Sequence, residues 1–215
     1  YMPKKLWSKL AIFPSDIGAI TADCDLSIRK KSSFLKFLCM PSDFERKGLQ
    51  IVLKAWSDIE KKHNASLTIV CPKFPMWLKK NEFQSVKWIE EGPLSIKSKK
   101  ELYVSHHVTL CPSLIDGGTD IIEALEFGTP CIVSEHHRTE SYLLNGTGYI
   151  VSSPYQYYDV KHYGVTWKSI DEYLSIVKNA IARGEYEPVV EEWKEYLLKY
   201  INDRSLSYVQ GRNAC

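Results

Sequence analysis

The chain of 215 residues is 44% apolar and 25% charged, which is ordinary usage for a globular protein with one sizeable core. Its 28 lysines and arginines nearly balance its 26 aspartates and glutamates, so the net charge of +2 does not indicate nucleic acid or an anionic membrane as a partner. No apolar run is long enough to span a bilayer, and no signal peptide pattern is present. We therefore expect a cytoplasmic protein without a transmembrane segment.

Six cysteines are spread along the chain, and no two of them have the spacing of a metal site or a redox motif. Four of them, Cys39, Cys71, Cys111 and Cys131, lie inside or beside apolar runs. Free cysteine packs as a small hydrophobic residue. We predict that these four are buried free thiols, and a disulfide or a zinc site is the alternative.

From residue 34 onward, short apolar runs rich in β-formers alternate with segments of helical periodicity. This alternation is typical of a parallel sheet that helices cover on both faces. Several runs are unbroken, as expected for strands that are buried on both sides. We predict an α/β fold with a Rossmann-like, doubly wound parallel sheet of about six strands, at residues 34–40, 67–71, 86–89, 108–111, 130–134 and 149–152.

The intervening segments carry helix signals. Apolar residues at helical spacing predict helices over residues 49–59 and 190–201. Capping boxes predict two more helices, one from Ser98 and Glu101 and one from Ser169 and Glu172. A further helix follows the fourth strand and should end at Gly128, because Pro130 cannot continue it. Residues 153–167 have no clear period and are predicted to form a loop.

The strongest candidate site follows the fourth predicted strand. Gly117 and Gly118 lie between the end of that strand and a helix that begins near Thr119. Two glycines let the backbone approach a ligand closely, and the free amides and positive dipole end of a helix attract phosphate. Ligands of open α/β sheets bind at this edge of the sheet. A plain glycine turn is the alternative interpretation.

Residues 112–130 resemble the donor-binding signature of the retaining GT-B glycosyltransferases of group 1, the family of glycogen and sucrose synthase relatives. The resemblance implies that Glu123 accepts hydrogen bonds from the ribose of a nucleotide sugar. It also implies that Asp116 faces the donor sugar, although it is an aspartate rather than a glutamate and lies one residue closer to Glu123 than in the family. The glycine loop would contact the diphosphate. A glutamate that only compensates the helix dipole is the alternative.

Residues 43–49 resemble a second family segment, in which a lysine pairs with the donor phosphates. Lys47 matches that lysine. The family usually has an arginine five residues earlier, where this chain has Ser42, so either Arg46 substitutes for it or one phosphate contact is lost. The alternative is a solvated basic pair, which is unfavourable at the positive end of a helix.

Two histidine pairs lie at residues 106–107 and 136–137. Their separations fit no metal-ligand spacing, and we predict no metal site. The resemblance places the second pair beside the donor, so we include His136 among the donor contacts.

The resemblance implies a metal-independent transferase that moves a sugar from a nucleotide-diphosphate donor to a glycan or small-molecule acceptor with retention of configuration. UDP-sugar is favoured over GDP-sugar, and no other cofactor is expected. Residues 34–185 would be the nucleotide-sugar-binding, C-terminal half of a GT-B fold, and residues 186–215 a C-terminal helix and tail. Residues 1–33 would be a connector or a remnant of an N-terminal acceptor domain that is missing or separate. A non-catalytic binding module, or a phosphorylase or epimerase of the same fold, is the alternative.

Overall fold

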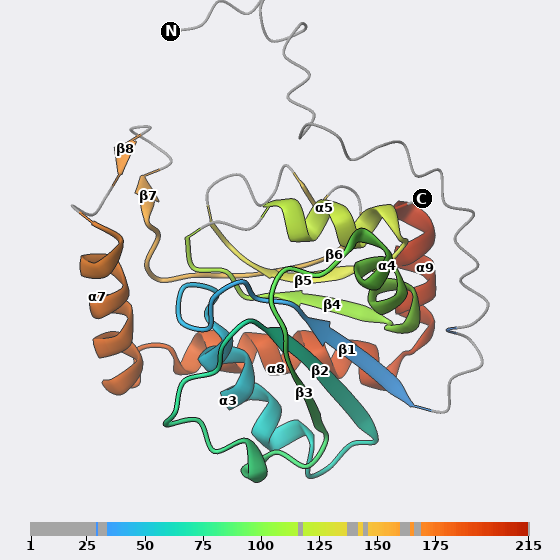
Figure 1. Cartoon of the computed structure of the whole chain (residues 1–215), viewed down its shortest axis with the longest axis horizontal. Helices are drawn as coiled ribbons and strands as arrows, with labels where there is room; N and C mark the ends of the chain where they lie inside the picture. Colours follow the sequence, from blue (N-terminus) through green and yellow to red (C-terminus); the bar gives the residue numbers. More distant parts are fainter. Residues whose placement is uncertain are drawn as a thin grey trace, which may run out of the picture.

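The computed structural model describes residue 29 and residues 34–115, 118–136, 142–143, 146–159, 164–165 and 169–214. At its centre is a six-stranded sheet in the order β3-β2-β1-β4-β5-β6, and all neighbouring strands are parallel. This confirms the predicted Rossmann-like α/β fold. Each predicted strand is found within two residues of its expected ends: β1 (Leu35–Cys39), β2 (Ala65–Cys71), β3 (Val86–Glu90), β4 (Val108–Cys111), β5 (Cys131–Ser134) and β6 (Gly148–Val151) (Figure 1).

Burial along the strands explains their sequence pattern. Every residue of β4 and of β5 is buried, because helices cover both sides of the middle of the sheet. The edge strand β3 instead exposes Lys87 and Glu90, and charged side chains at an edge discourage pairing with another chain. The unbroken apolar runs therefore mark the central strands.

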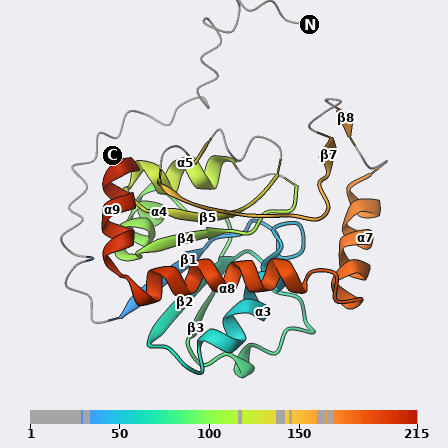
Figure 2. The same cartoon turned by 180° about the vertical axis from the view of Figure 1, so that it is seen from behind.

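Helices pack on both faces of the sheet. One face carries α3 (Leu49–Ile59) and α8 (Glu187–Asn202), and the other carries α4 (Ile96–Ser105) and α5 (Gly118–Glu126) (Figures 1 and 2). The helix α7 (Ile170–Ala182) adds buried side chains to the core that contains α3 and α8. None of the helices that the structure describes is long and apolar enough to cross a membrane.

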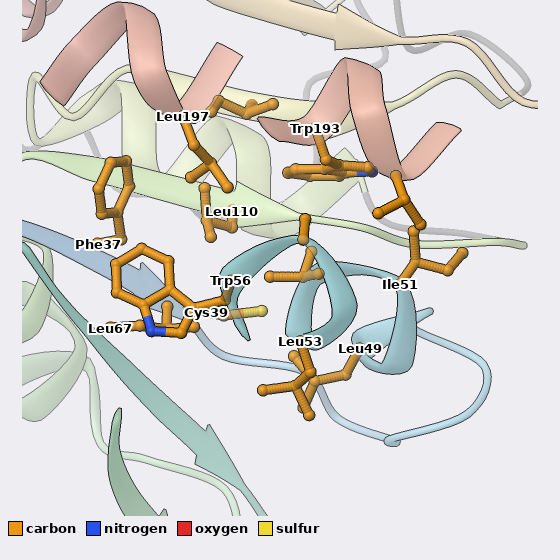
Figure 3. Packing of buried hydrophobic residues seen from close by; sticks show 14 of the residues in the cluster. Phe37, Cys39, Leu49, Ile51, Leu53, Trp56, Leu67, Leu110, Trp193 and Leu197 are labelled. Carbon is orange, nitrogen blue, oxygen red and sulfur yellow. The ribbon is translucent and has the colours of Figure 1, made fainter. Parts of the chain in front are cut away.

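The larger core lies between the sheet and the layer of α3 and α8 (Figure 3). Trp56 of α3 and Trp193 of α8 are fully buried there, and Trp56 meets Phe37 of β1 edge to face with ring centroids 5.5 Å apart. In the smaller core, Tyr103 of α4 stacks on Phe127 at 5.7 Å. Fully burying one large apolar side chain contributes about 1.5–3 kcal/mol, so these aromatic residues hold the helices to the sheet.

Three local predictions hold and one needs correction. Gly128, with φ of +62°, ends α5, and Ser169 caps α7 by accepting from the backbone N–H of Glu172. The four cysteines that we predicted to be buried free thiols are indeed buried, and none of them forms a disulfide. The cap of α4, however, is Ser95 and not Ser98, whose backbone N–H donates to Ser95 Oγ at 3.1 Å. Gly92 and Pro93 end the preceding extended segment, and the helix begins directly after Ser95, one turn earlier than predicted.

Several short elements were not predicted, among them a 3-10 helix at Lys80–Glu82. The segment expected to be a loop contains a short antiparallel pair, β7 (Tyr158–Asp159) with β8 (Gly164–Val165), and two-residue strands carry no readable period. Beyond α8, the expected tail contains α9 (Ser205–Ala214), which packs against α8 and α5.

Arg29, in the segment predicted to be a connector, is almost fully buried at 5% exposure. Its guanidinium donates to Thr129 Oγ1 at 2.7 Å, to the carbonyl oxygens of Tyr103 and Phe127 at 3.1 Å each, and to that of Gly128. The last carbonyls of a helix are its negative end, so a cation here stabilises the end of α5. One arginine in a weakly patterned segment gives no sequence signal for such a contact.

His106 and His107 join α4 to β4. The Leu102 carbonyl lies 2.7 Å from His106 Nδ1 and can only accept, so Nδ1 carries the proton and Nε2 accepts from Thr68 Oγ1 at 2.8 Å. His107 Nδ1 accepts from the backbone N–H of Lys36 at 3.1 Å. Burial lowers the pKa of His106 to about 4 and also lowers the pKa of His107. Both rings are therefore neutral supports of the fold at pH 7.

Replacing Arg29 by methionine should lower the free energy of unfolding by about 3 kcal/mol, because several buried carbonyls lose a charged donor. Urea denaturation at pH 7 measures the change. The matched control is Arg212→Met at an exposed position of α9, which should leave the midpoint unchanged. Equal midpoints for the two variants would contradict the assigned role.

Acid should destabilise the fold through His106. The pKa of His106 is about 4 in the folded chain and 6.5 without the fold, so the unfolded chain binds more protons between these values. Stability is therefore complete above pH 6.5 and falls as the pH drops, by about 2 kcal/mol between pH 7 and pH 5. In urea titrations, His106→Gln should lose this part of the pH dependence, and His63→Gln, in the turn after α3, should keep it. A His106→Gln variant with the full acid sensitivity would refute the assignment.

Candidate functional site

The order of the strands reverses between β1 and β4, because the chain adds β2 and β3 on one side of β1 and then β4, β5 and β6 on the other. The connections from two such strands lead to helices on opposite faces of the sheet, and a crevice forms at the carboxyl ends of the strands. A pocket lies at this position, lined by the ends of both strands and by α5. We call it the switch-point pocket; its lining includes Cys39, Lys47, Tyr103, Cys111, Ser113 and Asp120.

The loop after β1 contacts the loop after β4 through the backbone. The N–H of Leu114 donates to the carbonyl of Arg46 at 3.1 Å. Gly48 has φ of +62°, and a Cβ on it would lie only 2.3 Å from the carbonyl oxygen of Pro112. Only glycine allows this approach. The contact holds Lys47 beside the segment that leads into α5.

Local hydrogen bonds to Asp43 shape the loop after β1. Asp43 Oδ1 accepts from the backbone N–H of Arg46 at 2.8 Å, and the Asp43 carbonyl accepts from that of Lys47 at 3.2 Å. Lys47 is half-buried and lines the switch-point pocket. Arg46, also half-buried, and Ser42, which is exposed, are not among the lining residues. Of the predicted contacts on this loop, the structure brings Lys47 to the pocket.

The first turn of α5 forms another side of the pocket. Asp116 and Gly117 lie outside the described residues, and α5 begins at Gly118. A Cβ on Gly118 would lie 2.6 Å from the ring of Tyr142, so this ring packs directly against the helix start. Thr119 is exposed, and Asp120 lines the pocket.

Glu123 lies one turn further along α5 and is engaged by α4. Lys99 Nζ lies 2.8 Å from Glu123 Oε1 and 2.9 Å from Oε2. The hydroxyl of Tyr103 donates to Glu123 Oε2 at 3.2 Å. Burial and the nearby carboxylates of Glu123 and Asp120 raise the pKa of Tyr103, so its hydroxyl remains a donor. Tyr103 also lines the pocket and therefore links Glu123 to it.

Two hydroxyls on β4 and its following loop have no hydrogen-bond partner within the described part of the chain. Thr109 Oγ1 and Ser113 Oγ are both buried, and both residues line the switch-point pocket. Buried polar atoms are normally hydrogen-bonded, so such a pair indicates a place for a polar ligand or water.

The thiols at the pocket are not nucleophiles at neutral pH. Burial, with the nearby carboxylate of Asp120, raises the pKa of Cys39. A hydrogen bond with Cys131, together with burial, raises the pKa of Cys111. The thiolate is the reactive form of cysteine, so neither side chain can support covalent catalysis there.

His136, predicted to contact the donor, is buried directly after β5 and is not among the residues that line the pocket. His137 lies outside the described residues. Among the residues that the structure describes, no group of three or more His, Cys, Asp or Glu side chains could hold a metal ion.

Sequence reasoning missed several residues of this site, among them Thr109, Asp120, Lys99 and Tyr103. Asp120 could have been found, because it lies three residues before Glu123 and so shares its face of the helix. Lys99 and Tyr103 come from α4, 24 and 20 residues before Glu123 along the chain. No local sequence pattern indicates that side chains of two different helices will pair.

Replacing Gly48 by alanine should cost more stability than the same change elsewhere, because the methyl group meets the Pro112 carbonyl in addition to the strain of positive φ. The strain alone is about 1–2 kcal/mol. Gly184→Ala isolates it, since Gly184 has φ of +79° and its nearest neighbour would be 3.9 Å away. Gly92→Ala, with nothing within 4 Å, should be neutral. If urea denaturation gave Gly48→Ala no greater loss than Gly184→Ala, the close contact would be disproved.

Residues 36–159 match the protein family described as Glycosyl transferases group 1. No curated protein matches the sequence significantly. Among solved structures, WaaG, a glycosyltransferase involved in lipopolysaccharide biosynthesis, is 18% identical with a TM-score of 0.49, over 90% of this chain and 50% of WaaG. HepE of Anabaena, solved in complex with UDP-glucose, is 13% identical with a TM-score of 0.48, over 90% of this chain and 53% of HepE.

The C-terminal domain of LpcC, a group 1 family protein from Francisella tularensis, is 14% identical with a TM-score of 0.44, over 77% of this chain and 84% of that domain. The chain thus spans about half the length of WaaG and HepE. The family match covers more than half of the chain and includes the whole switch-point pocket from Cys39 to Asp120. The chain therefore belongs to the group 1 family of glycosyl transferases.

Proposed function

We propose that this chain binds a nucleotide-diphosphate sugar at the switch-point pocket and, with an N-terminal acceptor domain, transfers the sugar with retention of configuration to a glycan or small-molecule acceptor. The observation that carries the proposal is that Lys47 and the first turn of α5 line one pocket at the carboxyl ends of β1 and β4. Membership of the group 1 family supports the donor class. We favour UDP-sugar over GDP-sugar on the sequence resemblance.

The diphosphate is the part of the donor that the charges and donors of these residues suit best. Lys47 is a point charge on a flexible stem, and the start of α5 supplies backbone amides and a positive dipole end. The hydroxyls of Thr109 and Ser113 can donate to phosphate oxygens. The net charge of the whole chain is only +2, so attraction for the anion must come from this local arrangement.

These groups would also promote transfer. The bond between the anomeric carbon and the β-phosphate oxygen breaks with its electron pair on that oxygen, the acceptor oxygen bonds to the same face of the carbon, and the acceptor's proton passes to the departing diphosphate. Negative charge builds on the departing diphosphate, and a prearranged cation and amides lower the barrier by stabilising it. In this scheme Lys47 stabilises the leaving group and Asp116 orients the sugar.

The remaining predicted residues have binding roles in the proposal. Glu123 accepts hydrogen bonds from the ribose, and Gly117, Gly118 and Thr119 contact the diphosphate from the start of α5. Ser42, Arg46 and His136, which are not among the lining residues, are assigned as outer contacts of the donor.

A non-catalytic binding module is the second candidate, and two observations favour it. Both oxygens of Glu123 face Lys99, and Ser42 stands where the family keeps a cationic partner for phosphate. The ion pair does not decide the question, because the side chains of Lys99 and Glu123 are 32% and 20% exposed. Pairs near the surface are worth about 1 kcal/mol or less, so a ligand can replace the lysine.

Calorimetric titration of the chain with UDP, GDP and UDP-glucose tests the proposal, and Lys47→Ala is the decisive variant. We expect binding of at least one nucleotide, and Lys47→Ala should weaken it by about 2 kcal/mol, the scale of a lost charged hydrogen bond, or roughly thirtyfold in Kd. The neutral control is Lys62→Ala, at an exposed position after α3.

Slow release of free sugar from the bound donor would distinguish a transferase from a module that only binds. Silence towards every nucleotide would overturn the proposed function. Equal affinity of Lys47→Ala and the parent chain would remove Lys47 from the site.

A further inference from the structure

The carboxylate that would hold the ribose already has a cationic partner. Lys99 on α4 faces both oxygens of Glu123 on α5, at 2.8 and 2.9 Å. A carboxylate has about four lone-pair sites, so an ammonium placed between both oxygens takes the direction from which a pair of hydroxyl donors would approach. In this arrangement Glu123 is not open to a diol.

The two partners of Glu123 differ in how easily they can leave. Tyr103 is fully buried, stacks on Phe127, and donates to Glu123 from a fixed position. Lys99 has a side chain that is 32% exposed on a flexible stem. Its ammonium can swing into water and be hydrated there, whereas the Tyr103 hydroxyl cannot. The exchangeable partner is therefore Lys99.

We propose that Lys99 competes with the donor ribose for Glu123 and so sets the affinity of this chain for its nucleotide. The inference rests on the proposed function, in which Glu123 accepts the ribose hydroxyls. Binding exchanges one ion pair for two hydrogen bonds that neutral hydroxyls donate to the carboxylate, while Tyr103 stays and keeps the carboxylate oriented. Lys99 thus lowers the affinity that the site would otherwise have.

The sign of the effect separates competition from general electrostatics. Removing a cation near a diphosphate site should weaken the binding of every anion. If Lys99 instead blocks Glu123, its removal tightens the binding of ligands that carry a ribose and does not tighten the binding of inorganic pyrophosphate, which has none.

The test is calorimetric titration of UDP and of pyrophosphate into the parent chain, Lys99→Met and Lys100→Met. Lys100 is exposed on the same helix and is the matched control for charge. We expect Lys99→Met to lower the Kd for UDP about fivefold, the scale of one partly exposed ion pair. Its Kd for pyrophosphate should stay the same or rise, and Lys100→Met should not bind UDP more tightly.

Further variants guard against a fold defect. Lys99→Arg keeps the charge and should bind UDP as the parent does, and circular dichroism checks that Lys99→Met retains its helices. In a Glu123→Gln background, Lys99→Met should no longer tighten UDP binding, because there is no carboxylate left to release.

The outcomes distinguish a failure of this inference from a failure of the proposed function on which it rests. Tighter UDP binding by Lys99→Met than by the parent, without tighter pyrophosphate binding, would support it. UDP affinity that is unchanged or weaker in Lys99→Met would overturn it and leave the proposed function standing. If neither UDP nor pyrophosphate binds to any variant, both fall.

Discussion

The candidate site depends on the backbone contact between the loops that follow β1 and β4. These strands pair in parallel, with Leu38 opposite Thr109, so both loops leave the sheet at the same edge. Gly48 then packs against the Pro112 carbonyl in a conformation that a residue with a Cβ would adopt only under strain. Without this contact, nothing in the backbone would hold the loop of Lys47 next to the segment that leads into α5. With it, they line one pocket.

The helix α5 transmits this constraint along nine residues. Its first turn is fixed by the loop contact and by the ring of Tyr142 on Gly118. Its other end is fixed by the buried guanidinium of Arg29, which binds the carbonyls of Phe127 and Gly128. A short helix that is held at both ends has little freedom to move, so the side chains that it presents to the pocket keep their positions. Arg29 thus supports the site although it is not among the residues that line the pocket.

The charges around α5 form one connected arrangement. Asp120 lines the pocket, Glu123 follows one turn later, and Tyr103 lies between them with a pKa raised by burial and by both carboxylates. Cations approach from two sides, Lys47 at the pocket and Lys99 from α4. In a chain of nearly balanced charge, cations that can pair with phosphate thus lie near carboxylates that can accept hydrogen bonds from hydroxyls. A nucleotide sugar carries both kinds of group.

The sequence by itself determined the sheet, the end of α5 and the buried thiols. Strands that are buried on both faces need unbroken apolar runs. A helix that ends in a residue of positive φ favours a glycine there, such as Gly128. Both features depend on neighbouring residues in the chain, so the local sequence indicates them. It also carried the resemblance that led to Lys47 and Glu123. Only the tertiary structure decided which partners these side chains meet. Lys99 reaches Glu123 from 24 residues away, and Arg29 reaches Gly128 from 99 residues away. Contacts between such distant segments produce no periodic pattern or fixed spacing in the sequence, so the sequence alone does not reveal them.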